Sequence, residues 1–267
     1  MDDTQFKLLR IEVEGGVATV SIDNPPINAM SAALTWELST FCDRADRDES
    51  IRVIIFKSAD PEFFIAHADV HLFLEHTDPL TTAALDAFRL MVRRFQTWDK
   101  VTIAQIEGRA SGGGCEFLEA TDMRFAAIGK TFLSHPEVSL GFIPCKGGSQ
   151  RLVPLVGRGR ALELILGGAF ITAEVAETYG LINRALMPPA LGTFVRKLAT
   201  RIAGCPEQTV RYARQCVNAA TDEGVTGLTL EKQLFERIVA TPETQRRLRE
   251  YNERVGQDRA KELRMGL

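Results

Sequence analysis

Residues 111–116 read Ser-Gly-Gly-Gly-Cys-Glu, and this stretch decides what the rest of the chain can be. Small residues from Gly108 give way to helix-forming residues up to Ala120, which predicts a helix that begins at Gly113. Glycines permit close approach and unusual dihedral angles, and the first turn of a helix offers unpaired N–H groups whose dipole favours negative charge. Amides of this kind can form an oxyanion hole, and Glu116 would stand beside them.

A second acidic residue, Glu137, lies next to another glycine-rich turn. It belongs to Ser134-His135-Pro136-Glu137-Val138, and residues 146–152, Lys-Gly-Gly-Ser-Gln-Arg-Leu, lead into a further helix. Two carboxyl groups in one partly desolvated site cannot both ionise freely, which suits an acid and a base. By itself Glu116 would more often be a favourable charge at a helix start, and Glu137 a solvated turn residue. The two turns together are what indicate a catalytic site.

Strand and helix patterns alternate around these turns. Residues 8–22 form two alternating runs about Gly15-Gly16, a typical hairpin signal. Further along, the pattern predicts a helix capped by Ser31 and ending near Asp48, a strand at Val53–Phe56, a helix within Pro79–Trp98, and strands at Val101–Ile106 and Met123–Ala127. This alternation predicts an α/β core with helices packed on a sheet.

Beyond about residue 189 the strand signals stop and helical patterns dominate. The predicted helices are Phe194–Ala203, Glu207–Ala219, Leu228–Val239 and Glu243–Arg254. We therefore divide the chain into a core of residues 1–190 and a helical region of residues 191–267. The helix Leu228–Val239 has an apolar face that a partner subunit could cover.

Composition excludes several classes of protein. The chain has 267 residues, 45% hydrophobic and 25% charged, as expected for one large globular domain. A net charge of -3 with interspersed signs gives no electrostatic footprint for nucleic acid or an anionic membrane. Five widely spaced cysteines, without a Cys-x-x-Cys pair, argue against a disulfide framework or structural zinc. Because no signal peptide or membrane span is evident, we expect a cytoplasmic protein without nucleic-acid or membrane partners.

The two glutamate segments together resemble the signature of the enoyl-CoA hydratase/isomerase (crotonase) family. A Gly-Gly-Gly-Cys-Glu run, a Pro-Glu pair and a Gly-Gly-Ser-Gln-Arg helix start occur in the family's order. Phe64–Val70 is similar to the family's oxyanion loop, Pro26–Met30 to the loop that borders the CoA adenine, and Gly157–Arg184 to the segment after the second glutamate. The resemblance spans roughly residues 8 to 190.

The resemblance implies a crotonase-like (ClpP/crotonase) α/β fold, with a ββα spiral core and a helical C-terminal region that forms trimers or a hexamer of two trimers. It implies an acyl-CoA thioester as substrate, with no metal or other cofactor, since coenzyme A is part of the substrate. The implied site has Glu116 and Glu137 as the catalytic pair, the Ala68 and Gly113 amides as the oxyanion hole, and substrate contacts from Ala66, Asp69, Ile27 and Gly112. The residue that matches Glu137 usually delivers a proton to the α-carbon.

Hydration of a 2-enoyl-CoA to a 3-hydroxyacyl-CoA is the activity that the pair of glutamates favours. Members of the family that only shift a double bond, or do other enolate chemistry, commonly keep one glutamate. Isomerisation or other enolate chemistry is therefore the alternative, and non-catalytic binding of acyl-CoA esters is a third.

Several residues depart from the family pattern. His67 stands where glycine is common, His135 where glutamine or leucine is common, and Cys145-Lys146 replaces a small pair. The i, i+4 spacing of His67 and His71 would suit a shared metal ion. However, Asp69 as an N-cap would place His67 before the helix, so we predict no metal site.

Overall fold

The fold begins with the predicted hairpin. The computed structural model describes residues 6–74, 77–205, 207–219, 236 and 239–264. Strands β1 (Leu9–Glu14) and β2 (Val17–Ile22) pair antiparallel about Gly15 and Gly16, whose φ angles of 56° and 81° are positive. Positive φ at both central residues is the requirement of a type I′ turn, which explains the two glycines.

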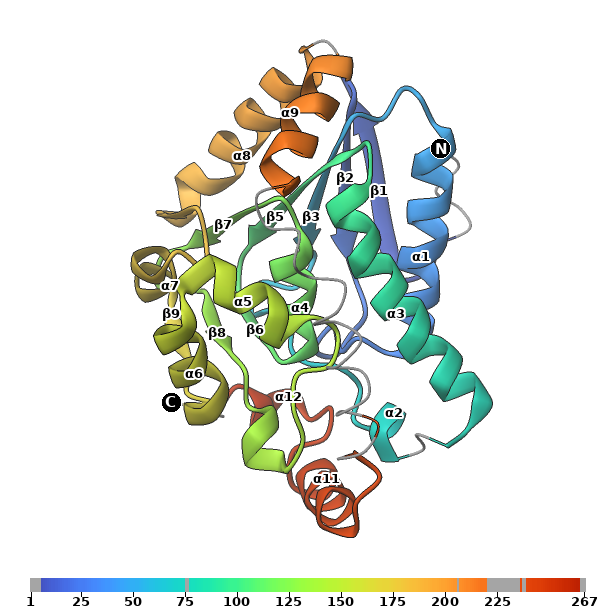
Figure 1. The fold of residues 1–267 in the computed structure, drawn as a ribbon, viewed down its shortest axis with the longest axis vertical. Coiled ribbons are helices and arrows are strands. Elements are labelled where there is room, and N and C mark those ends of the chain that lie inside the picture. Colours follow the sequence, from blue (N-terminus) through green and yellow to red (C-terminus); the bar gives the residue numbers. More distant parts are fainter. Residues whose placement is uncertain (1–5, 75–76, 206, 220–235, 237–238, 265–267) are drawn as a thin grey trace.

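The hairpin opens a larger sheet that runs through the centre of the molecule (Figure 1). Among the described residues this sheet has the strand order β1-β2-β3-β5-β7-β10. After the hairpin it contains β3 (Val53–Ser58), β5 (Val101–Ile106), β7 (Met123–Ala127) and β10 (Arg184–Leu186), all paired in parallel. The predicted strands are confirmed, and the burial of parallel strands on both faces explains apolar runs such as Val53–Phe56.

A second, smaller sheet has the order β4-β6-β8-β9. It consists of β4 (Phe63–Ile65), β6 (Arg109–Ser111), β8 (Phe132–Ser134) and β9 (Ile171–Thr172). The chain passes from the larger sheet to the smaller one three times, from β3 to β4, β5 to β6 and β7 to β8, and a helix follows each passage. This is a ββα repeat, and the smaller sheet is the part that the sequence patterns did not reveal.

Helices cover both faces of the larger sheet (Figure 1). On one face α1 (Ala32–Arg47), α3 (Pro79–Thr97) and α4 (Gly113–Ala120) pack over residues that include Ile54 and Phe56. On the other face α8 (Pro188–Ala203) packs over Val53 and Ile55. The alternation of neighbouring residues between two apolar layers is the expected two-residue period of a strand.

The remaining helices are shorter or lie toward the C-terminus. They are α2 (His71–Leu74), η2 (Glu137–Leu140), α5 (Gly148–Val156), α6 (Arg158–Gly167), α7 (Ala173–Tyr179), α9 (Glu207–Ala219), α11 (Pro242–Arg254) and α12 (Arg259–Glu262). The predicted helix Leu228–Val239 lies almost entirely outside the described residues. In the described part of the chain, no helix combines the length and apolar character that crossing a membrane requires.

The start of α4 lies unusually close to the end of β4. A Cβ added to Gly114 would lie 2.2 Å from the Ile65 carbonyl oxygen, and one added to Gly113 would lie 2.9 Å from Ala68 Cβ. The Ile65 carbonyl oxygen and Ala68 Cβ are fixed to the backbone, so they cannot move away as the end of a long, flexible side chain could. The absence of side chains at these two positions is therefore what permits this packing.

We expect Gly114→Ala to lower the free energy of unfolding by about 1–3 kcal/mol, the typical cost of forcing extra atoms into a packed interior. Gly159→Ala is the matched control, because Gly159 lies in α6 with no atom within 4 Å of an added Cβ. This control should be neutral or stabilising by up to about 1 kcal/mol, as for Gly→Ala in a helix. Urea unfolding of both variants is the measurement, and equal stabilities would contradict the packing argument.

Candidate active site

Three segments converge where strands of the smaller sheet end. The chain leaves β4 into Ala66–Ala68, leaves β6 into Gly112, and leaves β8 into His135–Glu137. Backbone hydrogen bonds hold these exits together, because the Ser111 amide donates to Ala66 O at 3.0 Å and the Gly112 amide donates to Ser134 O at 3.0 Å. The small sheet therefore sets the relative positions of all three segments.

Gly113, the first residue of α4, lies against Ala68 at this convergence. A Cβ added to Gly113 would lie 3.3 Å from the Ala68 amide nitrogen. Among the described residues, neither amide N–H donates a hydrogen bond to another part of the chain. Buried backbone N–H groups are nearly always paired, so two neighbouring amides without acceptors can receive a ligand oxygen.

Glu116 is buried in the first turn of α4, with an exposed fraction of 3%. Its Oε1 accepts hydrogen bonds from the amides of Lys146 at 2.5 Å and Gly148 at 3.1 Å. Gly148 is the first residue of α5, so the carboxyl group lies at the positive end of that helix. These contacts fix the direction of the Glu116 side chain.

Glu137 is also buried and begins the short helix η2. Its Oε1 would lie 3.1 Å from a Cβ added to Gly112, whose φ is 48°. Its Oε2 lies 3.7 Å from His135 Nδ1, and His135 Nε2 lies 2.6 Å from Glu119 Oε1. The carboxyl group of Glu137 therefore lies between the glycine turn and a buried histidine.

One cavity of about 40 Å³ brings the predicted groups together. Ala68, Gly112, Gly113, Glu116 and Glu137 all line it. The rest of its wall is mostly apolar and includes Val70, Phe73, Leu140, Phe142, Ile143, Leu248 and Tyr251. A cavity needs about 10–15 Å³ to hold one water molecule, so this cavity has room for water.

Comparisons with known proteins place this fold and these motifs in one family. The family model described as enoyl-CoA hydratase/isomerase matches residues 12–259. The chain belongs to the enoyl-CoA hydratase/isomerase family. The short-chain-enoyl-CoA hydratase of Clostridium acetobutylicum is 31% identical, over 86% of this chain and 89% of that protein. The crotonyl-CoA hydratase of Syntrophomonas wolfei is 29% identical, over 88% and 91%.

Solved structures agree with this placement. A crystal structure from Streptomyces avermitilis, assigned as an enoyl-CoA hydratase, is 34% identical and has a TM-score of 0.90. The match covers 98% of this chain and 96% of that one. The predicted crotonase-like α/β fold is thereby confirmed.

Three of the residues predicted from the family pattern do not line the cavity. Ala66 and Ile27 are buried in a small apolar cluster with Ala29 and Phe63. Asp69 Oδ1 accepts a hydrogen bond from the His71 amide at 3.0 Å, at the start of α2. Their contacts with substrate therefore stay predictions, while their observed contacts shape the loops around the cavity.

The histidine spacing that could suit a metal ion has another explanation. His67 is buried, with Nδ1 2.8 Å from Ala68 O and Nε2 2.8 Å from Glu262 Oε1, whereas His71 is exposed. Across the described ranges, no group of three His, Cys, Asp or Glu residues is arranged to hold a metal ion. In this family member, His67 joins the predicted oxyanion loop to the C-terminal helices.

The C-terminal helices close one side of the cavity, which the sequence patterns did not indicate. Leu248 and Tyr251 of α11 line it. The Tyr251 hydroxyl donates to Glu262 Oε1 at 3.1 Å, and the Tyr251 and His67 rings meet edge to face at 5.8 Å between centroids. Tyr251, Glu262 and His67 thus form one buried cluster beside the Ala68 amide, which we call the tail cluster.

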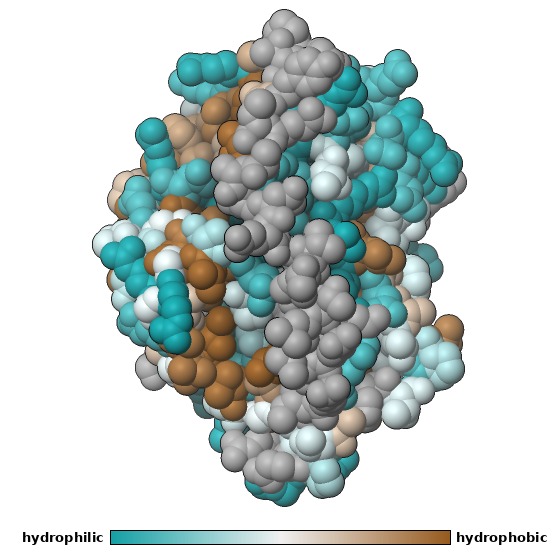
Figure 2. Space-filling model, in the orientation of Figure 1, coloured by the Kyte–Doolittle hydropathy of each residue, from teal (hydrophilic) through white to brown (hydrophobic). Residues whose placement is uncertain are grey.

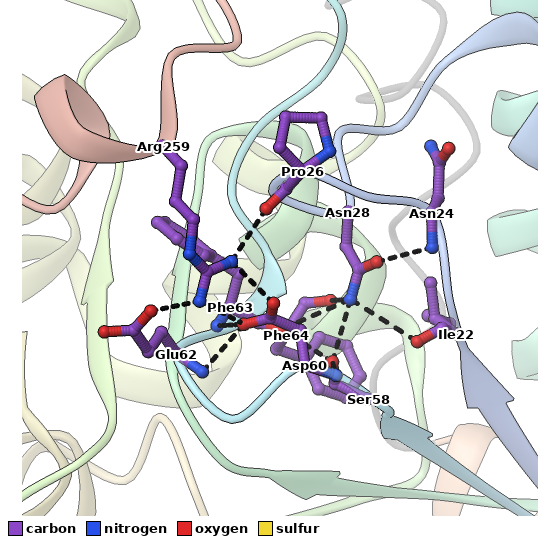
Figure 3. Close-up of polar contacts among 10 residues, drawn as sticks. All are labelled: Ile22, Asn24, Pro26, Asn28, Ser58, Asp60, Glu62, Phe63, Phe64 and Arg259. Carbon is purple, nitrogen blue, oxygen red and sulfur yellow. Dashed lines mark hydrogen bonds and ion pairs between the residues drawn. The ribbon is translucent and has the colours of Figure 1, made fainter.

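Arg259 of α12 binds the C-terminal segment of residues 242–264, called the tail below, to the N-terminal half of the chain (Figure 3). Its guanidinium donates to Pro26 O at 2.8 Å and to Asp60 Oδ2 at 2.6 Å, and it also pairs with Glu62. Figure 3 shows Asn28 beside these contacts, with its amide donating to Ser58 Oγ at 2.8 Å and to the carbonyl oxygens of neighbouring strands. The C-terminal segment is therefore bound to the loop that contains Pro26 and to the loop that precedes β4.

The two attachments of the tail should respond differently to pH. Burial opposes a charge on His67, but the hydrogen bond and negative charge of Glu262 prevail and raise the His67 pKa above its ordinary value. A raised pKa in the folded state stabilises the fold fully below the unfolded pKa of about 6.5, and this stabilisation is lost as pH rises through the folded pKa. The guanidinium of Arg259 stays charged throughout this range.

We therefore expect Glu262→Gln to remove a pH-dependent part of the protection of residues 242–264. In the parent protein, hydrogen-exchange protection factors of this segment should fall as pH rises above about 6.5. In Glu262→Gln they should be low at every pH, whereas Arg259→Ala should lower protection while keeping the pH dependence. The same pH dependence in Glu262→Gln as in the parent would show that His67 does not control the tail.

Proposed function

We propose that this protein is an enoyl-CoA hydratase, which adds water across the double bond of a 2-enoyl-CoA thioester to give a 3-hydroxyacyl-CoA. The single observation that carries this proposal is the pair of buried glutamates, Glu116 and Glu137, that line one cavity with the Ala68 and Gly113 residues, whose amides have no acceptor among the described residues. The hydratase names of the relatives from Clostridium acetobutylicum and Syntrophomonas wolfei support it.

The amides of Ala68 and Gly113 are proposed to bind the thioester carbonyl oxygen. As water adds to the β-carbon, negative charge moves onto this oxygen in an enolate-like transition state. Two amides held by the β4 exit and by α4 are already oriented, so they need no reorganisation when the charge forms. Each such donor is typically worth about 3–4 kcal/mol of transition-state stabilisation.

The two glutamates are proposed to divide the proton transfers. The Glu116 carboxylate, fixed by the Lys146 and Gly148 amides, takes a proton from the attacking water. Glu137 delivers a proton to the α-carbon. One C–O bond and one C–H bond form while the π bond of the C=C group and one O–H bond of water break, and the proton gained by Glu116 balances the one lost by Glu137. Transfer of a proton between the two sites restores the enzyme.

The subunit organisation is a further proposal, made from the family resemblance. We propose a trimer or a hexamer of two trimers, with a catalytic core of residues 1–190 and a helical region of residues 191–267 that takes part in assembly. Figure 2 shows apolar surface over α5 and beside α6, where Val153, Leu162 and Leu166 are exposed. A subunit interface would cover side chains of this kind, and light scattering would give the solution mass.

A cytoplasmic location is proposed on the chemistry of the cysteines. Cys42, Cys115, Cys145 and Cys205 are free thiols, and the first three are buried. Buried free thiols are ordinary in a reducing compartment.

The proposal predicts that both glutamates are required. Glu116→Gln and Glu137→Gln should each lower kcat for crotonyl-CoA by about 10²–10⁴-fold, the usual contribution of an acid or base. Glu163→Gln, an exposed change in α6, is the matched control and should keep full activity. Loss of the enoyl absorbance measures the rate.

The alternatives give different results in the same assay. If one variant kept nearly full activity, or a 3-enoyl-CoA were isomerised while crotonyl-CoA was not hydrated, a single-base reaction would replace hydration. If acyl-CoA esters bound to the parent protein without turnover, the protein would be a non-catalytic binder.

A further inference from the structure

A row of three buried titratable side chains, Glu119, His135 and Glu137, runs from the core to the cavity. Their side chains have exposed fractions of 1%, 2% and 5%. Glu119 follows Glu116 by three residues in α4, whereas His135 and Glu137 flank Pro136 after β8. Helix α4 thus supplies Glu116, which lines the cavity, and Glu119, which contacts His135 on the core side of Glu137.

The histidine bridges the two carboxyl groups. His135 Nε2 lies 2.6 Å from Glu119 Oε1, and His135 Nδ1 lies 3.7 Å from Glu137 Oε2. Among the described residues, neither Nδ1 nor Glu137 Oε2 has a hydrogen bond to any other group. Each of these two buried atoms therefore has the other as its ionic partner, and a small shift of Glu137 would turn the contact into a hydrogen bond.

The surroundings favour a charged imidazole. Burial opposes the charge on His135, but the charge and hydrogen bond of Glu119, followed by the nearby carboxyl group of Glu137, raise the His135 pKa well above its ordinary value. Cys115 faces the row as a neutral thiol, because burial raises its pKa to about 12. Arg124 interacts with Glu119 through its charge, while its guanidinium donates to the Leu181 and Thr121 carbonyl oxygens. The imidazolium thus lies between two carboxyl groups.

We propose that Glu119 and His135 form a positioning pair for Glu137. His135 draws Glu137 Oε2 toward the protein interior, which leaves Oε1 beside Gly112 at the cavity. When Glu137 delivers its proton to the α-carbon, the imidazolium stabilises the carboxylate that forms, and no proton leaves His135. The inference rests on the proposed hydratase reaction and adds a residue to it, because a neutral glutamine or leucine could not supply this charge.

A purely structural role is the competing explanation. A buried ion pair between α4 and the segment after β8 could simply hold these elements together, and removing either partner would then lower stability. A test must therefore measure the electrostatic interaction between His135 and Glu137, because stability and total activity would change in either case.

The first test measures the titration of His135 and does not depend on catalysis. Imidazole ¹⁵N NMR of the full chain follows its four histidines, and His135→Gln identifies the His135 signals. The titration midpoint of His135 should fall by about one pH unit or more in Glu137→Gln and in Glu119→Gln, since each change replaces a carboxyl group beside the imidazolium by a neutral amide. An unchanged midpoint in Glu137→Gln would overturn the proposal whatever the enzyme's activity.

The second test measures kcat, KM and the pH profile of the reaction with crotonyl-CoA. His135→Gln should lower kcat about tenfold or more with little change in KM, and should move one limb of the pH profile of kcat, because a buried positive charge beside the site is lost. The double variant Glu119→Gln/His135→Gln should be no slower than His135→Gln, since both act through one pair.

Asp122→Asn is the control for the loss of a partly buried ion pair, because Asp122 pairs with Arg214 away from the cavity. It should lower stability without moving the limb. An unmoved limb in a folded, active His135→Gln protein would overturn the proposal and leave the hydratase assignment intact. Absence of hydration by the parent protein would instead overturn the proposed function, and the NMR titration would still decide the coupling.

Discussion

The site depends on one steric constraint, the close approach of the start of α4 to the end of β4. Gly113 and Gly114 lie against Ala68 and the Ile65 carbonyl at distances that leave no room for a Cβ atom. Because the helix can approach this closely, Gly113 lies against the Ala68 amide, and within the described part of the chain the amides of both residues are without acceptors. The same approach carries Glu116 into the cavity from the first turn of the helix.

Charges buried in this apolar surrounding require partners, since an uncompensated buried charge costs several kcal/mol. Most of these partners come from distant parts of the chain. Glu116 accepts from two amides at the start of α5, Glu262 reaches from the C-terminal segment to His67, and Glu119 of α4 pairs with His135, which also faces Glu137. The electrostatics that hold the site in shape therefore also tie together segments that are distant in the sequence.

The long elements of the larger sheet could be predicted from sequence, and the smaller sheet could not. Val101–Ile106, Gly113–Ala120 and Met123–Ala127 have the predicted bounds, because each has a clear apolar pattern or a glycine start. Strands of three residues, such as Phe63–Ile65 and Phe132–Ser134, are too short to show alternation, and their parallel partners are far away in the chain.

The site was predictable only where a motif marked it. The family resemblance indicated Ala68, Gly113, Glu116 and Glu137, all of which line the cavity, but their roles in the reaction stay predictions. His67 and His135 stood out in the sequence as departures, with no sign of their partners. Glu119, Tyr251 and Glu262 gave no signal, because a contact between a helix and a distant loop leaves no local pattern in either.

The central claim is that the Ala68 and Gly113 amides bind the thioester oxygen between two glutamates. A crystal structure with butyryl-CoA, a saturated and unreactive analogue of crotonyl-CoA, tests it most directly. The account predicts the carbonyl oxygen about 2.7–3.1 Å from both amide nitrogens, with the α- and β-carbons between the Glu116 and Glu137 carboxyl groups. A carbonyl oxygen bound elsewhere, or acyl carbons that contact only one glutamate, would contradict it.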